Sequence, residues 1–416
     1  MNPAIFAPAG NFESLQAALN AGADGVYFGA GALNMRAGGA VNFTPEELPE
    51  VIARCHAAGT KADLALNTVI FDGEIPSVRE LCRIAKEASI DGIIAGDPAV
   101  LNVLREYRIP AHITVQCNVT NLEAVRFYAP YADVMVLARE LPLGSVAAIT
   151  EGIRREEIRG PSGELVKIEV FAHGALCVGI SGLCSMSLCT YGRSANRGKC
   201  LQNCRRRYLL HDAETGAELE IDNEYIMSPK DIRTVGFLDR ILDAGVAVLK
   251  IEGRGRPADY VDTTVRVYKE ARDAWKDGSF TEEKVADWNR RLETVFNRGF
   301  WEGGHYLGNT LSAWSGGPGN LATYRKEHVG LIAHYFPRAG VASVKMQSGV
   351  LRKGDRILIS GSSTGAMEVM IGELRVADSP VESACKGEEA SFAVPGKVRT
   401  GDRVQILKER IAEEEV

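Results

Sequence analysis

Five cysteines fall within one short stretch of this chain, between Cys177 and Cys204, whereas the other four are scattered. Cys177 and Cys184 are separated by six residues, and Cys200 and Cys204 by three. Thiolates that converge from a loop are good ligands for soft metals, so the pattern indicates a tetrahedral zinc ion or an iron–sulfur cluster. Structural zinc sites usually pair cysteines two to four residues apart, and the wider first gap therefore mildly favours a cluster.

The cysteine-rich stretch is also the one concentrated basic region of a chain with net charge −6. No acidic residue lies between Val170 and His211. Arginine binds phosphate and carboxylate through two parallel hydrogen bonds, which predicts binding of an RNA backbone or of an anionic small molecule. A solvated basic face is the alternative. The arginines of this stretch are Arg193, Arg197, Arg205, Arg206 and Arg207.

Around these residues, short apolar runs alternate with amphipathic stretches, which is typical of a parallel sheet covered by helices. The predicted strands are Ile5–Ala7, Gly25–Phe28, Ala62–Leu66, Gly92–Ala95, His112–Val115, Asp133–Leu137, Ile168–Ala172 and Val246–Ile251. The predicted helices include Phe12–Asn20, Pro45–His56, Ser77–Ala88 and Pro98–Tyr107. Eight such strands indicate an α/β fold with a closed (β/α)8, TIM-like barrel, and an open doubly wound sheet is the alternative.

The predicted domains follow from where this alternation is interrupted. About 70 residues separate the seventh strand from the eighth, so the barrel, residues 1–300, contains a cysteine-rich insertion at 168–208. A linker rich in glycine and aromatic residues is expected at 301–325. From Lys326 onward, short alternating runs broken by turn residues predict a small all-β barrel over 326–410.

Polar residues that directly follow barrel strands are candidates for the site, because active sites of such barrels lie at the carboxyl ends of the strands. They are Asn34, Arg36, Asn67, Gln116, Asn118, Arg139, Glu140, His173, Lys250, Glu252 and Arg254. His173, beside the first cysteine, is the best acid–base candidate, and Glu140, Lys250 and Glu252 are the other catalytic candidates. Lys250 is expected to pair with Glu252 or Glu140 if its role is structural.

The sequence also bears on location. The N-terminus has no basic segment followed by a long apolar one, and no run approaches the roughly 20 apolar residues of a membrane span. We therefore expect a cytoplasmic protein without a membrane partner. Free thiols rather than disulfides are expected in that compartment.

Several motifs together resemble those of the peptidase U32 family, which is called collagenase-like. They are "NMRAGGAVNF", "QCNVTN", "LARELPL", "FAHGALC…SGLCSMS", "ANRGKCLQNCRRRY", "YIMSPKDI", "LKIEGR" and "FNRGF", in the family's order. The resemblance covers nearly the whole chain, and its C-terminal part is similar to the second domain of elongation factor Tu. Length and domain content are most similar to the prephenate-dependent tRNA uridine hydroxylases of this family.

The resemblance implies an oxygen-independent hydroxylase that carries a [4Fe–4S] cluster and modifies the wobble uridine of tRNA, with prephenate as co-substrate. Cys177, Cys184, Cys200 and Cys204 would then be the cluster ligands. In some relatives the fourth ligand comes from the position that matches Ser228, so a serine there supports Cys204 instead. Cys189 has no role in that scheme.

Two alternatives stay open. The first is a peptidase, as the family name says, although we expect neither an H-E-x-x-H zinc site nor a serine-hydrolase nucleophile elbow. The grouped cysteines look like ligands rather than one activated nucleophile. The second alternative is a non-catalytic RNA-binding protein with a structural metal.

Overall fold

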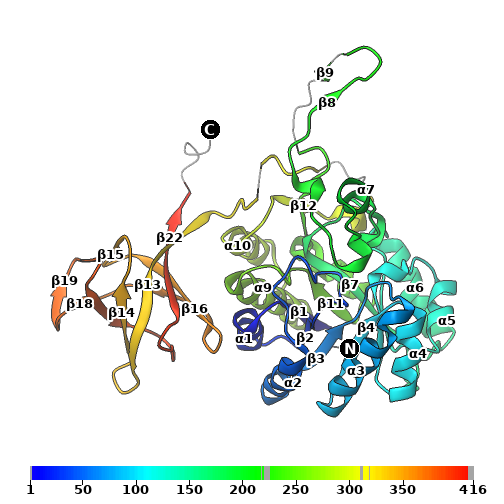
Figure 1. Cartoon of the computed structure of the whole chain (residues 1–416), viewed down its shortest axis with the longest axis horizontal. Coiled ribbons are helices and arrows are strands. Elements are labelled where there is room, and N and C mark those ends of the chain that lie inside the picture. The colour runs from blue at the N-terminus through cyan, green and yellow to red at the C-terminus, as the bar shows by residue number, and fades with distance from the viewer. Residues whose placement is uncertain (1, 217, 220–224, 310–312, 318, 411–416) are drawn as a thin grey trace.

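The N-terminal part of the chain is a closed barrel of eight parallel strands (Figure 1). The computed structural model describes residues 2–216, 218–219, 225–309, 313–317 and 319–410. The strands are β1 (Ala4–Ala9), β2 (Gly25–Gly29), β3 (Lys61–Ala65), β4 (Gly92–Ala95), β5 (Ala111–Ile113), β6 (Val134–Val136), β7 (Lys167–Ala175) and β11 (Val248–Ile251). Pairing of β11 with both β1 and β7 closes the ring. The predicted α/β barrel is confirmed, and the open sheet is excluded.

Helices surround the barrel, and two of them begin and end at the predicted residues. They are α1 (Phe12–Asn20), α2 (Leu48–Ala57), α3 (Ile75–Glu87), α4 (Pro98–Tyr107), α5 (Leu122–Tyr128), α6 (Leu143–Arg155), α8 (Leu238–Asp243), α9 (Ala258–Asp277) and α10 (Glu282–Glu293). Asn11 caps α1 by accepting a hydrogen bond from Ser14 N, and Asp97 caps α4 in the same way from Ala99 N. Such caps satisfy backbone N–H groups that have no partner within the helix.

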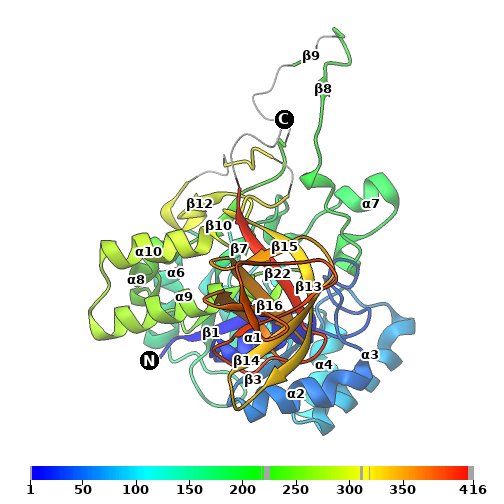
Figure 2. The same cartoon turned by 90° about the vertical axis from the view of Figure 1, so that its left-hand side faces the viewer.

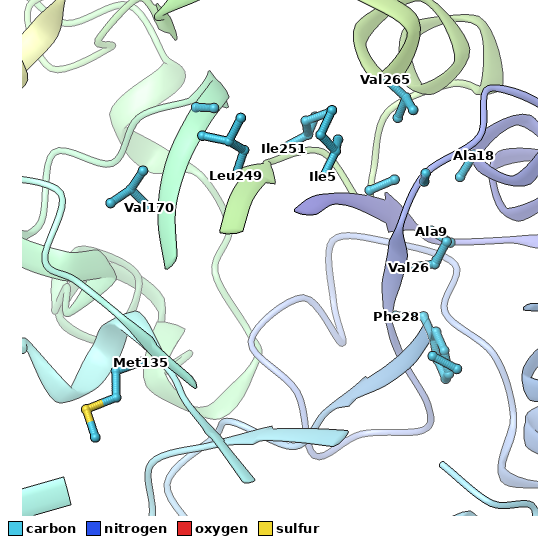
Figure 3. Close-up of a cluster of buried hydrophobic side chains, with 14 of the residues drawn as sticks. Ile5, Ala9, Ala18, Val26, Phe28, Met135, Val170, Leu249, Ile251 and Val265 are labelled. Atoms are coloured by element: carbon cyan, nitrogen blue, oxygen red, sulfur yellow. The ribbon is translucent and has the colours of Figure 1, made fainter. Parts of the chain in front are cut away.

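The main hydrophobic core lies between the strands and this layer of helices. Figure 3 shows Val170, Leu249, Ile5 and Val26 on the outer side of the ring of strands, with Val265 of α9 on the side of Ile5 and Ala18. Each of these side chains is fully or almost fully buried. Successive residues of a strand point to opposite faces, so the strand residues next to these outward-facing ones point into the barrel.

The inside of the barrel contains charged side chains, which is costly unless they are paired. His112 Nδ1 of β5 lies 2.9 Å from Asp63 Oδ2 of β3. Burial lowers the pKa of His112, but the carboxylates of Asp63 and Glu169 together outweigh burial and raise it overall. Lys250 of β11 pairs with Glu169 of β7 at 2.5 Å. Each of these buried side chains therefore has a partner of opposite charge or a carboxylate beside it inside the ring of strands.

The long gap between β7 and β11 folds into short elements rather than a single domain. They are η4 (Ile180–Gly182), α7 (Met186–Tyr191), η5 (Ala195–Arg197), η6 (Asn203–Arg205), β8 (Leu210–His211), β9 (Glu218–Leu219), β10 (Asp231–Arg233) and η7 (Val235–Phe237). β10 pairs antiparallel with β7, and β12 (Phe300–Glu302) pairs with β10, so the sheet gains two strands that were not predicted. Figures 1 and 2 both place α7 at the end of the barrel from which β8 projects.

The C-terminal part is a separate antiparallel β structure with its own hydrophobic core, seen at the front of Figure 2. Its strands are β13 (Tyr324–Phe336), β14 (Val341–Met346), β15 (Val350–Arg352), β16 (Arg356–Gly361), β17 (Gly365–Met370), β18 (Leu374–Val376), β19 (Ser379–Val381), β20 (Ser383–Cys385), β21 (Glu389–Ala393) and β22 (Arg403–Glu409). The likeness to elongation factor Tu stays a prediction.

The segment between the two parts, expected as a linker, contains β12 and η8 (Gly304–Leu307), while residues 310–312 and 318 lie outside the described part. Polar contacts join the two parts: Arg403 pairs with Glu13 at 2.6 Å, and Asn20 Nδ2 donates to Thr364 O at 2.9 Å. Within the described residues, we find no helix with the length and apolar character that crossing a membrane requires.

Candidate cysteine and arginine pocket

One pocket of about 220 Å³ lies at the carboxyl ends of the barrel strands. Its floor is formed by strand residues that point into the barrel, such as Tyr27, Val136 and Phe171. Its wall includes Cys177, Cys184, Cys200 and Cys204, the four predicted cluster ligands. Cys189 does not line it. The fold therefore brings together cysteines that are up to 27 residues apart in the sequence.

The cysteine segment supplies backbone donors as well as thiols. Gly179 N donates to Cys177 Sγ and Met186 N donates to Cys184 Sγ, both at 3.4 Å. Burial raises the pKa of Cys204, and the neighbouring Arg205 acts against that rise. Among the described residues, no three His, Cys, Asp or Glu side chains form a group that could hold a single metal ion. In a four-iron cluster each cysteine binds a different iron, so a donor set of four thiols spread along one pocket wall fits that group.

Polar residues of the barrel hold the loop between Cys177 and Cys184. Ser181, fully buried, donates from its N–H to Glu140 Oε1 at 2.8 Å and from its hydroxyl to Asn118 Oδ1 at 2.9 Å. Neither Glu140 nor Asn118 lines the pocket. Their position indicates that they fix the loop rather than contact a ligand.

The later half of the segment is held by loops that follow β2 and β3. Gly38 N donates to Gly198 O at 2.8 Å, and Val69 N donates to Asn196 O at 3.1 Å. Gly198 has φ +75°, and a Cβ there would lie 2.4 Å from Asn34 O. A glycine is therefore required for this approach.

The pocket carries an excess of positive charge. Its cationic side chains are Arg36, Arg139, Arg205, Lys250, Arg254, Arg256 and Arg298, and Glu252 is its one carboxylate among the described residues. Burial raises the pKa of Glu252, but the nearby guanidinium groups of Arg36, Arg256 and Arg139 outweigh burial and hold that pKa at about 2. Glu252 is therefore ionised, and it pairs with Arg36 at 2.8 Å.

Three of these arginines donate to neutral oxygens in the contacts that the structure describes. Arg139 donates to Ala175 O and Arg254 to Asn34 Oδ1, each at 3.0 Å. Arg205 donates to Leu176 O at 2.6 Å and to Ser228 Oγ at 3.0 Å. Burial lowers the pKa of Arg254 to about 10, which still leaves it charged at neutral pH. These charges favour an anionic ligand.

Lys250 has a different partner from the two that the sequence suggested. Its ammonium binds Glu169, not Glu252 or Glu140, and lies 4.4 Å from the centre of the Tyr27 ring. β11 and β7 are neighbouring parallel strands, with Lys250 opposite Phe171, and this register brings Glu169 within reach. The positive charge of Lys250 therefore faces the pocket from a fixed position on its floor.

The remaining predicted residues divide between the pocket and its surroundings. Those that line it are Arg36, Asn67, Gln116, Arg139, Arg205, Lys250, Glu252 and Arg254. Those that do not are Asn34, Asn118, Glu140, His173, Arg193, Arg197, Arg206 and Arg207. Asn67 Nδ2 donates to Gln116 Oε1 at 3.2 Å, which fixes both amides in the wall.

His173 lies in the protein interior rather than in the pocket. It is 1% exposed, and its ring packs against Tyr260, Tyr268 and Phe300. Its Nδ1 is 3.3 Å from the Tyr268 hydroxyl. Burial lowers the pKa of His173 to about 3, so it is neutral at neutral pH. Its catalytic role stays a prediction, and its surroundings favour a packing role.

Sequence reasoning missed Tyr27, Arg256 and Arg298 as pocket residues. Arg256 is two residues beyond Arg254, and it lies 3.1 Å from the buried carboxylate of Asp231. Arg298 lies within the motif "FNRGF", which in the sequence indicates only a family likeness. That motif was the available signal, although it follows no predicted strand.

Comparisons with known proteins agree with these motifs. The chain matches the sequence profile of peptidase family U32 over residues 10–315. A collagenase of Porphyromonas gingivalis is 47% identical over 98% of both chains. A tRNA hydroxylation protein of Bacillus subtilis is 29% identical over 86% of this chain and 83% of its own, and one of Helicobacter pylori is 32% identical over 72% and 70%. The chain belongs to peptidase family U32.

Proposed function

We propose that this protein is an iron–sulfur enzyme that hydroxylates the wobble uridine of tRNA at carbon 5 without molecular oxygen, with prephenate as co-substrate. One observation carries the proposal: four cysteines and an excess of cationic side chains line the same pocket. Relatives named as tRNA hydroxylation proteins support RNA as the substrate.

Cys177, Cys184, Cys200 and Cys204 would hold a [4Fe–4S] cluster, which would supply electron transfer at the pocket. The two backbone N–H groups that donate to Cys177 and Cys184 stabilise thiolate charge. Arg36 and Arg205 lie close enough to these cysteines to interact with them electrostatically. The positive charge of these two arginines partly offsets the negative charge of four thiolates.

The co-substrate would occupy the space between the cysteines and the barrel floor. Prephenate is a dicarboxylate, and Arg139 and Arg254 have guanidinium groups that bind only neutral oxygens in the described contacts. A carboxylate forms stronger hydrogen bonds to guanidinium than an amide or carbonyl does. Lys250 also lines this space, with its ammonium held in place by Glu169.

A peptidase is the second candidate, because the Porphyromonas gingivalis relative is named a collagenase. The letters G-S-S-T-G at 361–365 have the spacing of a hydrolase nucleophile motif. They form the turn between β16 and β17 of the C-terminal part, not the strand-to-helix turn on which that motif depends. The geometry therefore supports hydroxylation better.

The direct test uses anaerobically purified protein, tRNA and prephenate, followed by mass spectrometry of the tRNA nucleosides. The proposal predicts 5-hydroxyuridine with the wild type and none with Cys177→Ala. The same preparation should leave collagen intact. Collagen cleavage that survives Cys177→Ala, without any nucleoside product, would replace this proposal with the peptidase.

A further inference from the structure

Two exposed aromatic rings lie beside the pocket, outside its lining. Phe71, in the loop after β3, is 59% exposed, and Tyr191, the last residue of α7, is 46% exposed. Large aromatic side chains are usually buried, so rings left open next to a candidate active site indicate a binding surface.

Phe71 is held rigidly from one side. The guanidinium of Arg197 lies 3.8 Å from the centre of the Phe71 ring. Arg197 is itself fixed, because it donates to both oxygens of Glu74 at 2.6 and 2.7 Å and to Val69 O at 2.9 Å. The arginine covers one face of the ring, so a planar group can bind against the exposed remainder.

Tyr191 is paired with an arginine in the same manner. The guanidinium of Arg206 lies 5.1 Å from the ring centre of Tyr191 and also donates a hydrogen bond to its hydroxyl. Arg206 directly follows Arg205, a pocket residue. A ring that is already ordered loses little conformational entropy when a ligand binds to it.

Both pairs are attached to the pocket wall. Arg197 belongs to the short helix η5, whose first residue, Ala195, lines the pocket. The surface around the pairs combines apolar and cationic side chains. Val69, whose carbonyl accepts from Arg197, and Leu188, on the same helix as Tyr191, are exposed apolar members, and Arg193 and Arg206 are exposed cations near Tyr191 in the chain or in space.

We propose that Phe71 and Tyr191, each ordered by its arginine, are two platforms on which unpaired nucleobases of an RNA loop stack beside the base that enters the pocket. The inference rests on the proposed function and specifies which RNA the surface takes. Every base has a π face, but in a duplex the neighbouring bases cover it, so such platforms select single-stranded segments. The surrounding cations suit the phosphate groups of such a loop in a chain of net charge −6.

Fluorescence anisotropy with the full-length protein tests this inference. The probes are an RNA hairpin with an unpaired loop and a blunt duplex that repeats its stem. We expect the wild type to bind the hairpin more tightly than the duplex. Phe71→Leu and Tyr191→Leu, which keep apolar character but remove the ring, should each weaken hairpin binding roughly tenfold and leave duplex binding unchanged.

Matched variants separate stacking from general surface effects. Phe71→Trp and Tyr191→Phe keep an aromatic face and should retain tight hairpin binding. Phe127→Leu changes a phenylalanine that is 66% exposed on α5, away from the pocket, and should have no effect. Hairpin binding that is equally tight in both leucine variants would overturn the platforms while leaving tRNA hydroxylation standing. A wild type that binds neither RNA would contradict the proposed function itself.

Discussion

Cys189 shares the cysteine-rich segment with the four proposed ligands but lies exposed on α7, outside the pocket. The position of Cys189 therefore distinguishes it from the four pocket cysteines, although all five lie in one short stretch of chain. It also makes Cys189 a matched control, because a substitution there changes the same residue type in the same segment.

We expect anaerobically purified protein to be brown, with about four iron and four sulfide ions per chain. Alanine at Cys177, Cys184, Cys200 or Cys204 should remove most of the iron and the visible absorbance, whereas Cys189→Ala should keep both. Iron and sulfide assays together with absorption spectra measure this. Colourless wild-type protein that contains one zinc ion would contradict the cluster.

His173 provides a pH-dependent prediction. Its folded pKa, about 3, is below the ordinary value of 6.5, so its stabilisation is complete above pH 6.5 and is lost as the pH falls toward 3. Between pH 7 and 5 the wild type should lose about 2 kcal/mol more unfolding free energy than His173→Gln. Urea unfolding at both pH values checks this. Equal losses in the two proteins would show that His173 is not held neutral by burial.

Among the elements, the loop from Cys177 to Cys184 depends on one barrel carboxylate. Glu140 accepts the N–H of the buried Ser181, and without that acceptor a buried donor loses its partner, at a cost of about 1–3 kcal/mol. Glu140→Ala should therefore lower the iron content, and Glu140→Gln, which keeps an acceptor oxygen, should largely restore it. Glu123→Ala, which changes an exposed carboxylate on α5, is the control. Full iron content in Glu140→Ala would contradict a role in holding the loop.

Most strands and helices of the barrel could be predicted, because buried strands are continuous apolar runs and the covering helices are amphipathic. β4, α1 and α4 have the predicted bounds, since Gly92–Ala95 is a continuous apolar run and both helices have capping side chains. β10 and β12 were missed: Asp231–Arg233 is short and contains two charged residues. Its charges are compensated by tertiary partners such as Arg256, which no local pattern reveals.

Site residues that follow strands could be predicted from the sequence. Contacts that depend on the register between neighbouring strands could not. Arg139, Glu252 and Arg254 come directly after strands and line the pocket. Pairing of Lys250 with Glu169 depends on how β11 lies against β7, and the sequence does not specify that register. Arg206 and Arg207 were grouped with Arg205, but the structure separates them, because Arg205 is anchored to backbone carbonyls and Ser228.

At the scale of the whole molecule, two hydrophobic cores divide the chain between the barrel and the C-terminal β part. Residues that line the pocket all precede Phe300. Ion pairs join the parts: the pair of Arg403 with Glu13 is partly exposed and contributes little stability, whereas Lys326 pairs with Asp259, whose side chain is only 7% exposed. We expect the barrel to keep its pocket without the C-terminal part, because that part contributes no residue to the pocket lining.

A chain that ends at Thr323 should retain the iron content and visible spectrum of the full protein, while most modification of full-length tRNA is lost. Metal analysis and nucleoside mass spectrometry measure the two properties separately. We expect the C-terminal part to position the RNA, since it contributes no pocket residue. A shortened chain that modifies tRNA as fast as the full protein would exclude that role.

The central claim is that the cysteine-lined pocket performs tRNA hydroxylation, and mass spectrometry of tRNA nucleosides from living cells tests it most directly. Cells that lack the gene should lose 5-hydroxyuridine and its further-modified forms at the wobble position. A plasmid with the wild-type gene should restore them, whereas one with Cys177→Ala should not, although Cys189→Ala should. Unchanged tRNA nucleosides in cells without the gene, in the absence of a second gene of this family, would contradict the claim.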